Sequence, residues 1–192
     1  MNLCVIIALG DIMKLTEKTL STELKFKGRI INVRHDQIEL PDGKQAMREV
    51  VEHPGGACIA ALNEKGELLL VEQYRYPFSM EMLEFPAGKL EPNEDPLEAA
   101  KRELIEETGY EALEIIPLGL VYPSVGYLSE IIYIYFAPKT KFVGQDLDEG
   151  EFLNVRTYFY KELLDMAYSG KINDAKTLTI LLRLKKYISG NL

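Results

Sequence analysis

The spacing of hydrophobic and polar residues along this chain changes several times, and each change predicts a different element. Alternating residues, or short apolar runs bounded by turn residues, predict strands. The expected strands cover residues 23–27, 29–40, 45–52, 57–62, 67–75, 112–122, 130–136 and 152–158. Apolar residues three and four positions apart predict helices from 95 to 109, over 160–168 and over 175–188. The order of these elements predicts a mixed α/β (α+β) protein.

Two turn sequences are expected to join neighbouring strands into hairpins. Residues 41–44 read Pro-Asp-Gly-Lys, with proline and glycine where a β-turn favours them. Residues 63–66 read Asn-Glu-Lys-Gly and lie between the strands 57–62 and 67–75. In the last helix a stripe of leucines is expected to face the core: Leu178, Leu181, Leu182 and Leu184.

The helix after residue 95 has clear start and stop signals. Asp95 suits the N-cap, Pro96 suits the first helical position, and Glu98 is placed to complete a capping box. Gly109 suits the left-handed residue that ends a helix. The expected core-facing residues are Leu97, Ala100 and Leu104. A loop therefore leads into a helix of about thirteen residues.

Three glutamates of this helix share one face. Glu103, Glu106 and Glu107 lie at i, i+3 and i+4, near the C-terminal end, where the helix dipole favours cations. The i+4 neighbours of Glu103 and Glu106 are Glu107 and Tyr110, so no lysine relieves the repulsion. A solvated acidic surface is the ordinary alternative. The crowding of like charges favours a site for a hard divalent cation, whose shell is completed by water and phosphate oxygens.

Composition and charge limit the remaining interpretations. The chain has 192 residues, of which 47% are hydrophobic, and a formal net charge of −8. These values predict one globular domain with a small appendage. Bulk nucleic-acid binding is not expected, because the short cluster of Arg183, Lys185 and Lys186 makes no basic stripe.

The two cysteines, Cys4 and Cys58, are too few for a disulfide framework and favour a cytoplasmic protein. Cys58 lies in an apolar strand and is expected to be a small buried residue rather than a nucleophile.

The N-terminal segment 1–14 is expected to be an addition to the folded chain. Residues 1–9 are apolar but too few to span a bilayer, and they lack the basic start of a signal peptide. We therefore expect no membrane association. The residues before Met13 are interpreted either as an upstream mis-start or as a small extra strand.

One stretch, GKLEPNEDPLEAAKRELIEETGY, carries a motif of high specificity. Seven residues have the spacing of the Nudix hydrolase signature: Gly88, Glu94, Arg102, Glu103, Glu106, Glu107 and Gly109. Leu104 fits its first bulky aliphatic position, and Tyr110 replaces an aliphatic residue at its last. The chain is identified as a member of the Nudix superfamily, whose enzymes hydrolyse diphosphates linked to another group.

Within that superfamily the chain resembles the bacterial ADP-ribose pyrophosphatases. The resemblance rests on FKGRIINV, ELPDGKQAMREVVEHPGG, VEQYRYP, MLEFPAGK, YPSVGYLSE, DEGEF and KINDAKTLTILL. It implies a Nudix α/β/α sandwich with a mixed sheet over residues 55–192, and an N-terminal β-rich dimerisation appendage over 15–54. It further implies Mg²⁺-dependent cleavage of ADP-ribose to AMP and ribose 5-phosphate by a homodimer, with Mn²⁺ as a substitute metal.

The resemblance also implies a role for each acidic residue of the site. The carbonyl of Ala87 and the carboxylates of Glu103, Glu107 and Glu151 match metal ligands. Glu149 matches the general base that accepts a proton from water, and Glu106 is a second catalytic candidate. The choice between Glu149 and Glu151 as base stays open. Gly88, Glu94, Arg102 and Gly109 are structural, and Arg102 is expected to pair with Glu94.

Further positions match substrate contacts of the family. Arg48 and Arg75 match residues that hold the diphosphate and ribose ends. Arg29, Ile30, Glu49, His53 and Lys89 match contacts on the adenosine or phosphate side. Ser124, Val125, Gly126 and Glu130 match the loop around the terminal ribose, where Val125 replaces the usual proline. Surface ion pairing is the alternative for Arg48, because Glu49 and Glu52 are near in sequence.

Two other functions stay open at this point. The substrate could be another nucleoside diphosphate sugar, such as ADP-glucose, or an oxidised nucleotide. A ligand-sensing Nudix domain without activity is disfavoured, because such domains usually lose signature glutamates and all three are present here.

Overall fold

The computed structural model describes residues 14–147 and 149–188, which divide into two compact units. The first unit ends at Glu52, and the second begins at His53. Except for Lys14, the N-terminal segment 1–14 lies outside the described residues.

The first unit contains an antiparallel sheet of three strands. β1 (Lys18–Lys27), β2 (Asn32–Glu39) and β3 (Gln45–Glu52) lie in the order β1-β2-β3. The turn between β2 and β3 is the expected one: Gly43 has a φ of 82°, and the Lys44 amide donates to Asp42 Oδ1 at 3.1 Å. All ten residues of β1 are exposed.

The second unit contains two sheets. Its strands are β4 (Gly56–Ala61), β5 (Leu68–Arg75), β6 (Met80–Glu84), β7 (Ala87–Lys89), β8 (Tyr110–Val121), β9 (Ile132–Phe142) and β10 (Leu153–Tyr158), with a short 3-10 helix η1 (Tyr76–Phe78). One sheet has the order β10-β5-β6, and the other has the order β7-β4-β9-β8. Only the β4–β9 pair of these sheets is parallel among the described strands, so the four-stranded sheet is mixed, as expected.

The predicted hairpin between residues 57–62 and 67–75 is wrong in one respect. The chain does turn at residues 63–66, but β4 and β5 belong to different sheets, joined only by a bridge between Leu62 and Leu68. Every residue of β4 is buried, because β4 pairs with β7 on one side and β9 on the other. A local turn signal cannot reveal this competition for partners.

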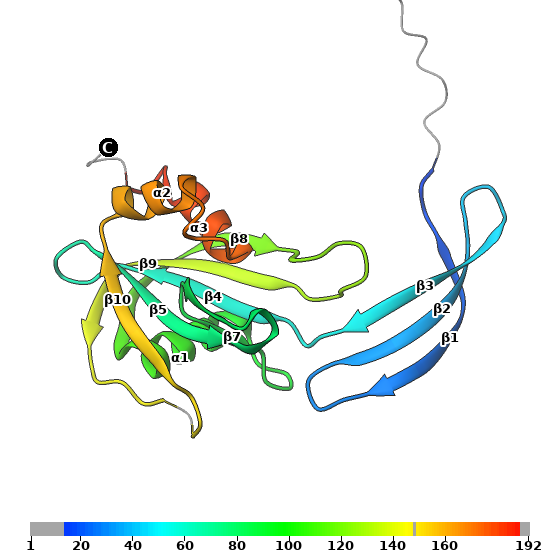
Figure 1. Cartoon of the computed structure of the whole chain (residues 1–192), viewed down its shortest axis with the longest axis horizontal. Helices are drawn as coiled ribbons and strands as arrows, with labels where there is room; N and C mark the ends of the chain where they lie inside the picture. The colour runs from blue at the N-terminus through cyan, green and yellow to red at the C-terminus, as the bar shows by residue number, and fades with distance from the viewer. Residues whose placement is uncertain (1–13, 148, 189–192) are drawn as a thin grey trace, which may run out of the picture. The chain divides into compact units, whose positions relative to one another are not determined.

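The helices cover both faces of the strands. The helices are α1 (Pro96–Thr108), α2 (Tyr160–Tyr168) and α3 (Ala175–Leu184). In Figure 1, α1 lies on one side of the strands and α2 and α3 lie on the other. Residues of β4 alternate accordingly: Ala57 and Ile59 pack in the cluster with α1, whereas Cys58 and Ala60 pack in the cluster with α2 and α3. This alternation gives the predicted α/β/α sandwich.

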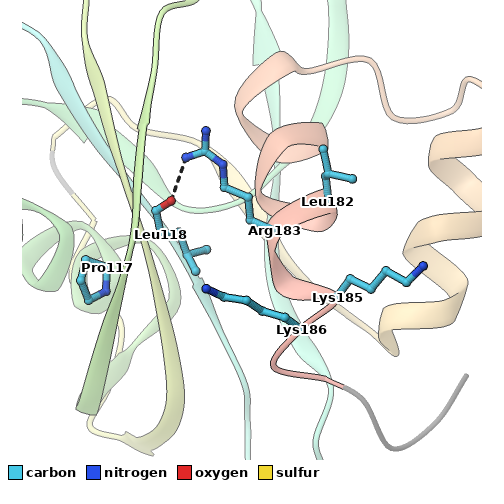
Figure 2. A pocket seen from close by; sticks show the side chains of 6 residues that line it. All are labelled: Pro117, Leu118, Leu182, Arg183, Lys185 and Lys186. Atoms are coloured by element: carbon cyan, nitrogen blue, oxygen red, sulfur yellow. Dashed lines mark hydrogen bonds between the residues drawn. The ribbon is translucent and has the colours of Figure 1, made fainter.

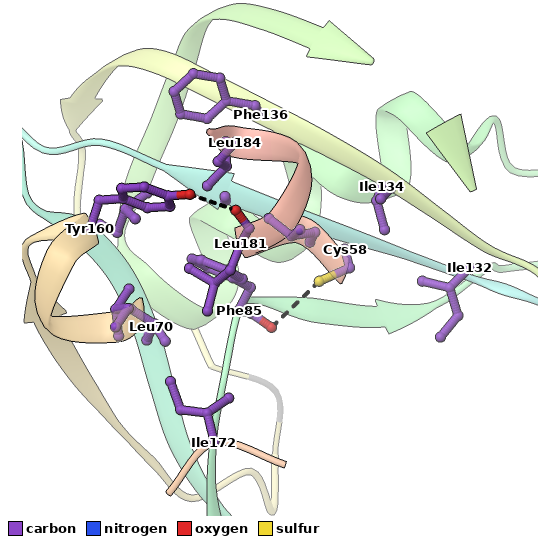
Figure 3. Close-up of a cluster of buried hydrophobic side chains, with 14 residues drawn as sticks. Cys58, Leu70, Phe85, Ile132, Ile134, Phe136, Tyr160, Ile172, Leu181 and Leu184 are labelled. Atoms are coloured by element: carbon purple, nitrogen blue, oxygen red, sulfur yellow. Dashed lines mark hydrogen bonds between the residues drawn. The ribbon is translucent and has the colours of Figure 1, made fainter. Parts of the chain in front are cut away.

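The larger core cluster joins α2 and α3 to the sheets (Figure 3). Its aromatic residues include Phe85 and Tyr160, whose hydroxyl donates to the Leu181 carbonyl at 2.9 Å. Cys58 is fully buried there, as expected, and burial raises the pKa of its thiol far above the ordinary value.

The predicted inner face of the last helix is partly wrong. Leu181 and Leu184 are buried, but Leu182 is 73% exposed and Leu178 is 37% exposed. The buried stripe instead consists of Thr177, Ile180, Leu181 and Leu184, which are related by helical spacings of three, four and seven. The prediction from the leucines was partly wrong because it did not include Thr177, a polar residue that is buried in the core.

Within the described part of the chain, no helix is long and apolar enough to cross a membrane.

Candidate active site

The α1 helix presents the signature glutamates, and its ends are fixed by the residues expected to fix them. Asp95 is the N-cap and accepts a hydrogen bond from the Leu97 amide at 2.8 Å. Gly109 ends the helix with a φ of 78°. The expected capping box is not formed, because Glu98 pairs with Lys101 at 2.7 Å instead. The i,i+3 ion pair with Lys101 thus replaces the hydrogen bond that Glu98 would make to the N-cap backbone.

Two carboxylates of α1 lie against strand β7. Glu107 Oε2 accepts a hydrogen bond from the Ala87 amide at 3.0 Å. The Glu103 carboxylate lies so close to Gly88 that a Cβ at that position would be 1.7 Å from Glu103 Oε1. Glycine is therefore required at residue 88, since any side chain would displace Glu103. The exposed fractions of Glu103 and Glu107 are only 8% and 4%.

Burial of these carboxylates makes their negative charge unfavourable. Burial raises the pKa of Glu107 to about 8. The negative charges of Glu103 and Glu151 also raise this pKa, whereas the hydrogen bond from the Ala87 amide lowers it. Burial also raises the pKa of Glu103, even though Arg102 lies 2.8 Å away and acts in the opposite direction. Desolvation outweighs this single ion pair because Arg102 is shared among several acids.

Arg102 braces the acidic surface. Its Nε lies 2.9 Å from Glu94 Oε1, so the expected Arg102–Glu94 ion pair is present. The same guanidinium donates to Glu103 Oε1 and Glu106 Oε2, both at 2.8 Å. Glu106 is therefore fixed through one carboxylate oxygen. These hydrogen bonds occupy the donors of Arg102, which fits a structural role rather than substrate contact.

The two candidates of the late acidic loop differ in their electrostatic effect on α1. The negative charge of Glu151 acts to raise the pKa of both Glu103 and Glu107. Glu149 is exposed and lies in the turn at Gly150. Among the described residues, neither Glu149 nor Glu151 forms a hydrogen bond or an ion pair of its own.

The donor set suits a hard cation. Glu103 and Glu107 are buried, and burial raises the pKa of both carboxyl groups, although Glu103 pairs with Arg102. Within residues 14–147 and 149–188, no group of three or more acidic, histidine or cysteine side chains forms a complete metal cage. Magnesium is usually held by only one or two carboxylates, with water and substrate phosphates completing its shell. The two buried glutamates therefore fit a divalent cation that is shared with the substrate.

A second group of candidates, His53 and Glu130, lies beside strand β7. His53 Nδ1 accepts from the Gly55 amide at 3.1 Å and lies 3.4 Å from Glu130 Oε1. A Cβ on Gly56 would be 2.8 Å from the Gly88 carbonyl and 4.0 Å from Glu130 Oε1. His53 and Glu130, which the sequence assigned to different parts of the substrate, are thus neighbours close to the signature loop.

Arg75 is engaged by a residue that the sequence interpretation overlooked. Its Nε and Nη2 donate to the two carboxylate oxygens of Glu84 at 2.7 and 2.8 Å. Glu84 is 1% exposed and also pairs with Lys176, which in turn lies 2.9 Å from Asp174. The signal that could have revealed this group is a lysine in the first turn of a helix, where the dipole disfavours it.

The remaining candidates of the second unit are mainly exposed. Val125 is 87% exposed, and the loop around it is closed by a hydrogen bond from the Leu128 amide to the Ser124 carbonyl at 3.3 Å. Gly126 is exposed in the same loop. Lys89 is exposed, and its carbonyl accepts a long hydrogen bond from Arg102 at 3.4 Å.

The other candidates belong to the first unit. Arg29 and Ile30 are exposed in the bend between β1 and β2. Arg48 pairs with Glu17 at 2.5 Å rather than with Glu49 or Glu52. Glu49 lies 3.5 Å from His35 Nε2. The surface ion pair considered for Arg48 is therefore present, with a different partner.

A cavity of about 370 Å³ lies elsewhere, between α3 and β8 (Figure 2). Its lining residues are Pro117, Leu118, Leu182, Arg183, Lys185 and Lys186. Arg183 donates to the carbonyls of Leu118 and Leu120 at 2.7 and 3.3 Å, which ties α3 to β8. The short basic cluster of the sequence is thus partly structural.

Comparison with known proteins agrees with this geometry. Residues 52–179 match the NUDIX domain family, and residues 17–51 match the nucleoside diphosphate sugar hydrolase N-terminal domain. The chain is 38% identical over 165 residues to the ADP-ribose pyrophosphatase of Bacillus subtilis (strain 168), covering 85% of this chain and 89% of the relative. It is 40% identical over 164 residues to the methanol dehydrogenase activator of Bacillus methanolicus, covering 84% and 89%.

A crystal structure of an ADP compounds hydrolase has the same fold, with a TM-score of 0.80 at 23% identity, covering 92% of this chain and 97% of that one. The NUDIX match spans the signature helix, the buried glutamates beside Gly88 and most of the sandwich. This chain therefore belongs to the Nudix family and is a Nudix hydrolase.

Proposed function

We propose that this Nudix hydrolase cleaves ADP-ribose to AMP and ribose 5-phosphate, using Mg²⁺, for which Mn²⁺ can substitute. The observation that carries this proposal is the pair of buried carboxylates of Glu103 and Glu107 against β7, whose pKa values are raised by burial. Nudix hydrolases generally use divalent metal ions, and the relative that is 38% identical over 85% of this chain is an ADP-ribose pyrophosphatase.

Glu103, Glu107, Glu151 and the carbonyl of Ala87 would hold the cation. A divalent cation bound there neutralises phosphate oxygens and lowers the pKa of a coordinated water. Glu151 is assigned to the metal, and Glu149 to the base, because these are the roles that the family resemblance implies.

The protein's own groups complete the chemistry. Glu149 accepts the proton of the water that attacks a phosphorus of the diphosphate. The bond from that phosphorus to the bridging oxygen breaks, and the bridging oxygen leaves with the other phosphate. Arg102 holds Glu106 and Glu103 in place during this step, through its hydrogen bonds at 2.8 Å.

The substrate is held by cations and by the loop after β8. Arg75 binds the diphosphate, and Lys89 contributes to the phosphate side. Ser124, Val125, Gly126 and Glu130 surround the terminal ribose, with His53 beside Glu130. A buried carboxylate left without its hydroxyl partner costs about 1–3 kcal/mol, so ligands without the ribose should bind more weakly.

We further propose that the protein acts as a homodimer assembled through the first unit. Each residue of β1 is exposed, including Leu20, Leu24 and Phe26, and Ile30 follows in the next bend. A ten-residue exposed strand with apolar side chains is a surface that proteins usually cover. In this proposal Arg29 and Ile30 reach the partner's substrate site.

The substrate assignment is tested by a panel of compounds. We expect kcat/KM to be highest for ADP-ribose, with ADP-glucose as the nearest competitor, because Val125 constrains the loop less than proline would. NADH and an oxidised dGTP should be poor substrates. Products should be identified as AMP and ribose 5-phosphate. A tenfold preference for any other compound of the panel would refute the assignment.

A second function is suggested by the relative that activates methanol dehydrogenase, at 40% identity over 84% of this chain. Adding the protein to a methanol dehydrogenase, with and without Mg²⁺, tests this function directly. An increase in dehydrogenase turnover that Glu107→Gln abolishes would show that hydrolysis and activation use the same site.

A further inference from the structure

Lys176 is buried at a position that disfavours a cation. It lies in the first turn of α3, where the helix dipole is positive, and its side chain is only 11% exposed. Lysine is almost never buried unless it is paired. Such a conflict between local preference and observed position is typical of a functional site.

The partner that explains Lys176 is Glu84. The Glu84 side chain is 2% exposed, and its Oε2 accepts hydrogen bonds from both Lys176 and Arg75. Its Oε1 accepts the Nε hydrogen bond of Arg75. Glu84 therefore links the largely enclosed Lys176 to Arg75, whose side chain is 37% exposed.

The end of α3 that carries Lys176 is attached to the segment between β6 and β7. Thr177 Oγ1 accepts from the Phe85 amide at 3.1 Å and donates to Asp174 Oδ2 at 2.6 Å. Phe85 directly follows Glu84 and lies in the core shown in Figure 3. Lys176 is thus held at a fixed distance from the strand that carries Glu84.

The geometry of Arg75 leaves part of its guanidinium available. Nε and Nη2 are bound to Glu84, whereas Nη1 has no hydrogen-bond partner among the residues described. The Glu84 hydrogen bond raises the pKa of Arg75, and the nearby charge of Glu107 acts in the same direction. Arg75 is therefore anchored on Glu84, with one donor group left for a ligand.

Charge balance gives Lys176 a second effect. Arg75 and Lys176 balance the two carboxylates of Glu84 and Asp174. Removing the lysine would leave this cluster with one excess negative charge close to Glu107. Such a charge would repel an anionic substrate and would draw Arg75 inward.

We propose that Lys176 is a positioning residue for the diphosphate: acting through Glu84, it fixes the guanidinium of Arg75 and balances the charge around it. This role rests on the proposed function, in which Arg75 binds the diphosphate. Since such a contact exists in the ground state and the transition state alike, its loss should raise KM and leave kcat nearly unchanged.

The test measures the Kd of ADP-ribose by calorimetry in metal-free protein, and KM and kcat for AMP release in Mg²⁺, well below the Tm of each variant. Lys176→Met should raise Kd and KM about tenfold, in the ordinary range for a coupled pair. Lys176→Arg should restore most of the affinity. Lys185→Met, an exposed lysine just after α3, is the matched control and should leave all three constants unchanged.

A double-mutant cycle with Arg75→Gln separates positioning from general destabilisation. Arg75→Gln should itself raise Kd, and Lys176→Met should add little in that background. Glu84→Gln, which retains the shape of the side chain, weakens the anchor of Arg75 without adding a negative charge. It should therefore raise Kd less than Lys176→Met does, and it serves as the second route if that variant does not fold.

The outcomes separate the two proposals. Multiplicative effects of Lys176→Met and Arg75→Gln would refute the positioning role alone, and so would an unchanged Kd in Lys176→Met while Arg75→Gln weakens binding. An unchanged Kd in Arg75→Gln would refute both the positioning role and the assignment of Arg75 to the diphosphate. A wild type that hydrolyses none of the nucleoside diphosphate sugars would refute the proposed activity, whatever the cycle shows.

Discussion

At the scale of single residues, the distinctive feature of the site is two carboxyl groups that are buried away from water. Glu103 and Glu107 are both nearly inaccessible, and Gly88 is the residue that allows Glu103 to lie there. Carboxylates buried in this way are costly without a counter-charge. In the proposed function, a bound cation supplies that counter-charge.

Replacing Glu107 by glutamine tests this charge directly. The variant keeps the size of the side chain, but hydrolysis should fall by about 10²-fold or more, as when other charge-stabilising groups are removed. The Tm of the metal-free protein should stay about the same at neutral pH, where the raised pKa leaves Glu107 largely protonated. It should rise above that of the wild type at higher pH, where the substitution removes a repulsive charge from the helix. Near-wild-type turnover in Mg²⁺ would contradict the assignment.

The raised pKa of Glu107 predicts a pH-dependent response to metal. The folded value of about 8 exceeds the ordinary value of 4.5, so this group stabilises the metal-free fold while it is protonated. That stabilisation is lost as the pH rises toward 8. A bound cation favours the ionised form, so the gain in Tm on adding Mg²⁺ should increase from pH 6 to pH 8.

Thermal melts of wild type and Glu107→Gln, with Mg²⁺ or EDTA across this pH range, check the prediction. The variant should show a smaller gain and little dependence on pH. A wild-type gain that decreases with pH would mean that another group controls the binding of the cation.

At the scale of elements, α3 is attached to the strands through a polar contact in the core. Thr177 is fully buried, and its hydroxyl accepts the Phe85 amide hydrogen bond. This contact fixes the position of the first turn of α3 beside the segment that leads to Ala87. Element packing and site geometry therefore depend on the same hydrogen bond.

Thr177→Val should lower the free energy of unfolding by about 1–3 kcal/mol, because the buried Phe85 amide loses its acceptor while the shape is retained. Thr177→Ser keeps the hydroxyl and should lose less stability. Urea denaturation of the metal-free variants measures both. Equal stability of Thr177→Val and wild type would show that the amide finds another partner.

At the scale of the whole molecule, the proposed dimer predicts a mass and its dependence on β1. Light scattering at micromolar concentration should give twice the chain mass. Leu24→Glu places a charge on an exposed apolar position of β1 and should shift the mass toward the monomer, together with a loss of activity. Leu113→Glu, an exposed leucine of the second unit, is the control and should leave the mass unchanged. A fully active wild-type monomer would rule out the proposal.

The sequence by itself determined the elements whose signals are local. The caps of α1, the turn at Gly43, the ion pair of Arg102 with Glu94 and the α/β/α class all followed from spacing, turn chemistry or the Nudix signature. Local signals succeed there because the interacting groups are near in sequence or belong to one helix.

Only the tertiary structure decided which distant residues meet. It separated β4 from β5, exposed Leu182 and buried Thr177 in the core. It also brought Lys176 to Glu84, which is 92 residues away in sequence. Periodicity shows which face of an element is apolar, but not which strand it pairs with or which polar group lies opposite. Strand pairing and the meeting of distant polar groups depend on burial and charge balance across the whole domain. In this protein they bring Lys176 and Arg75 to the same carboxylate, that of Glu84.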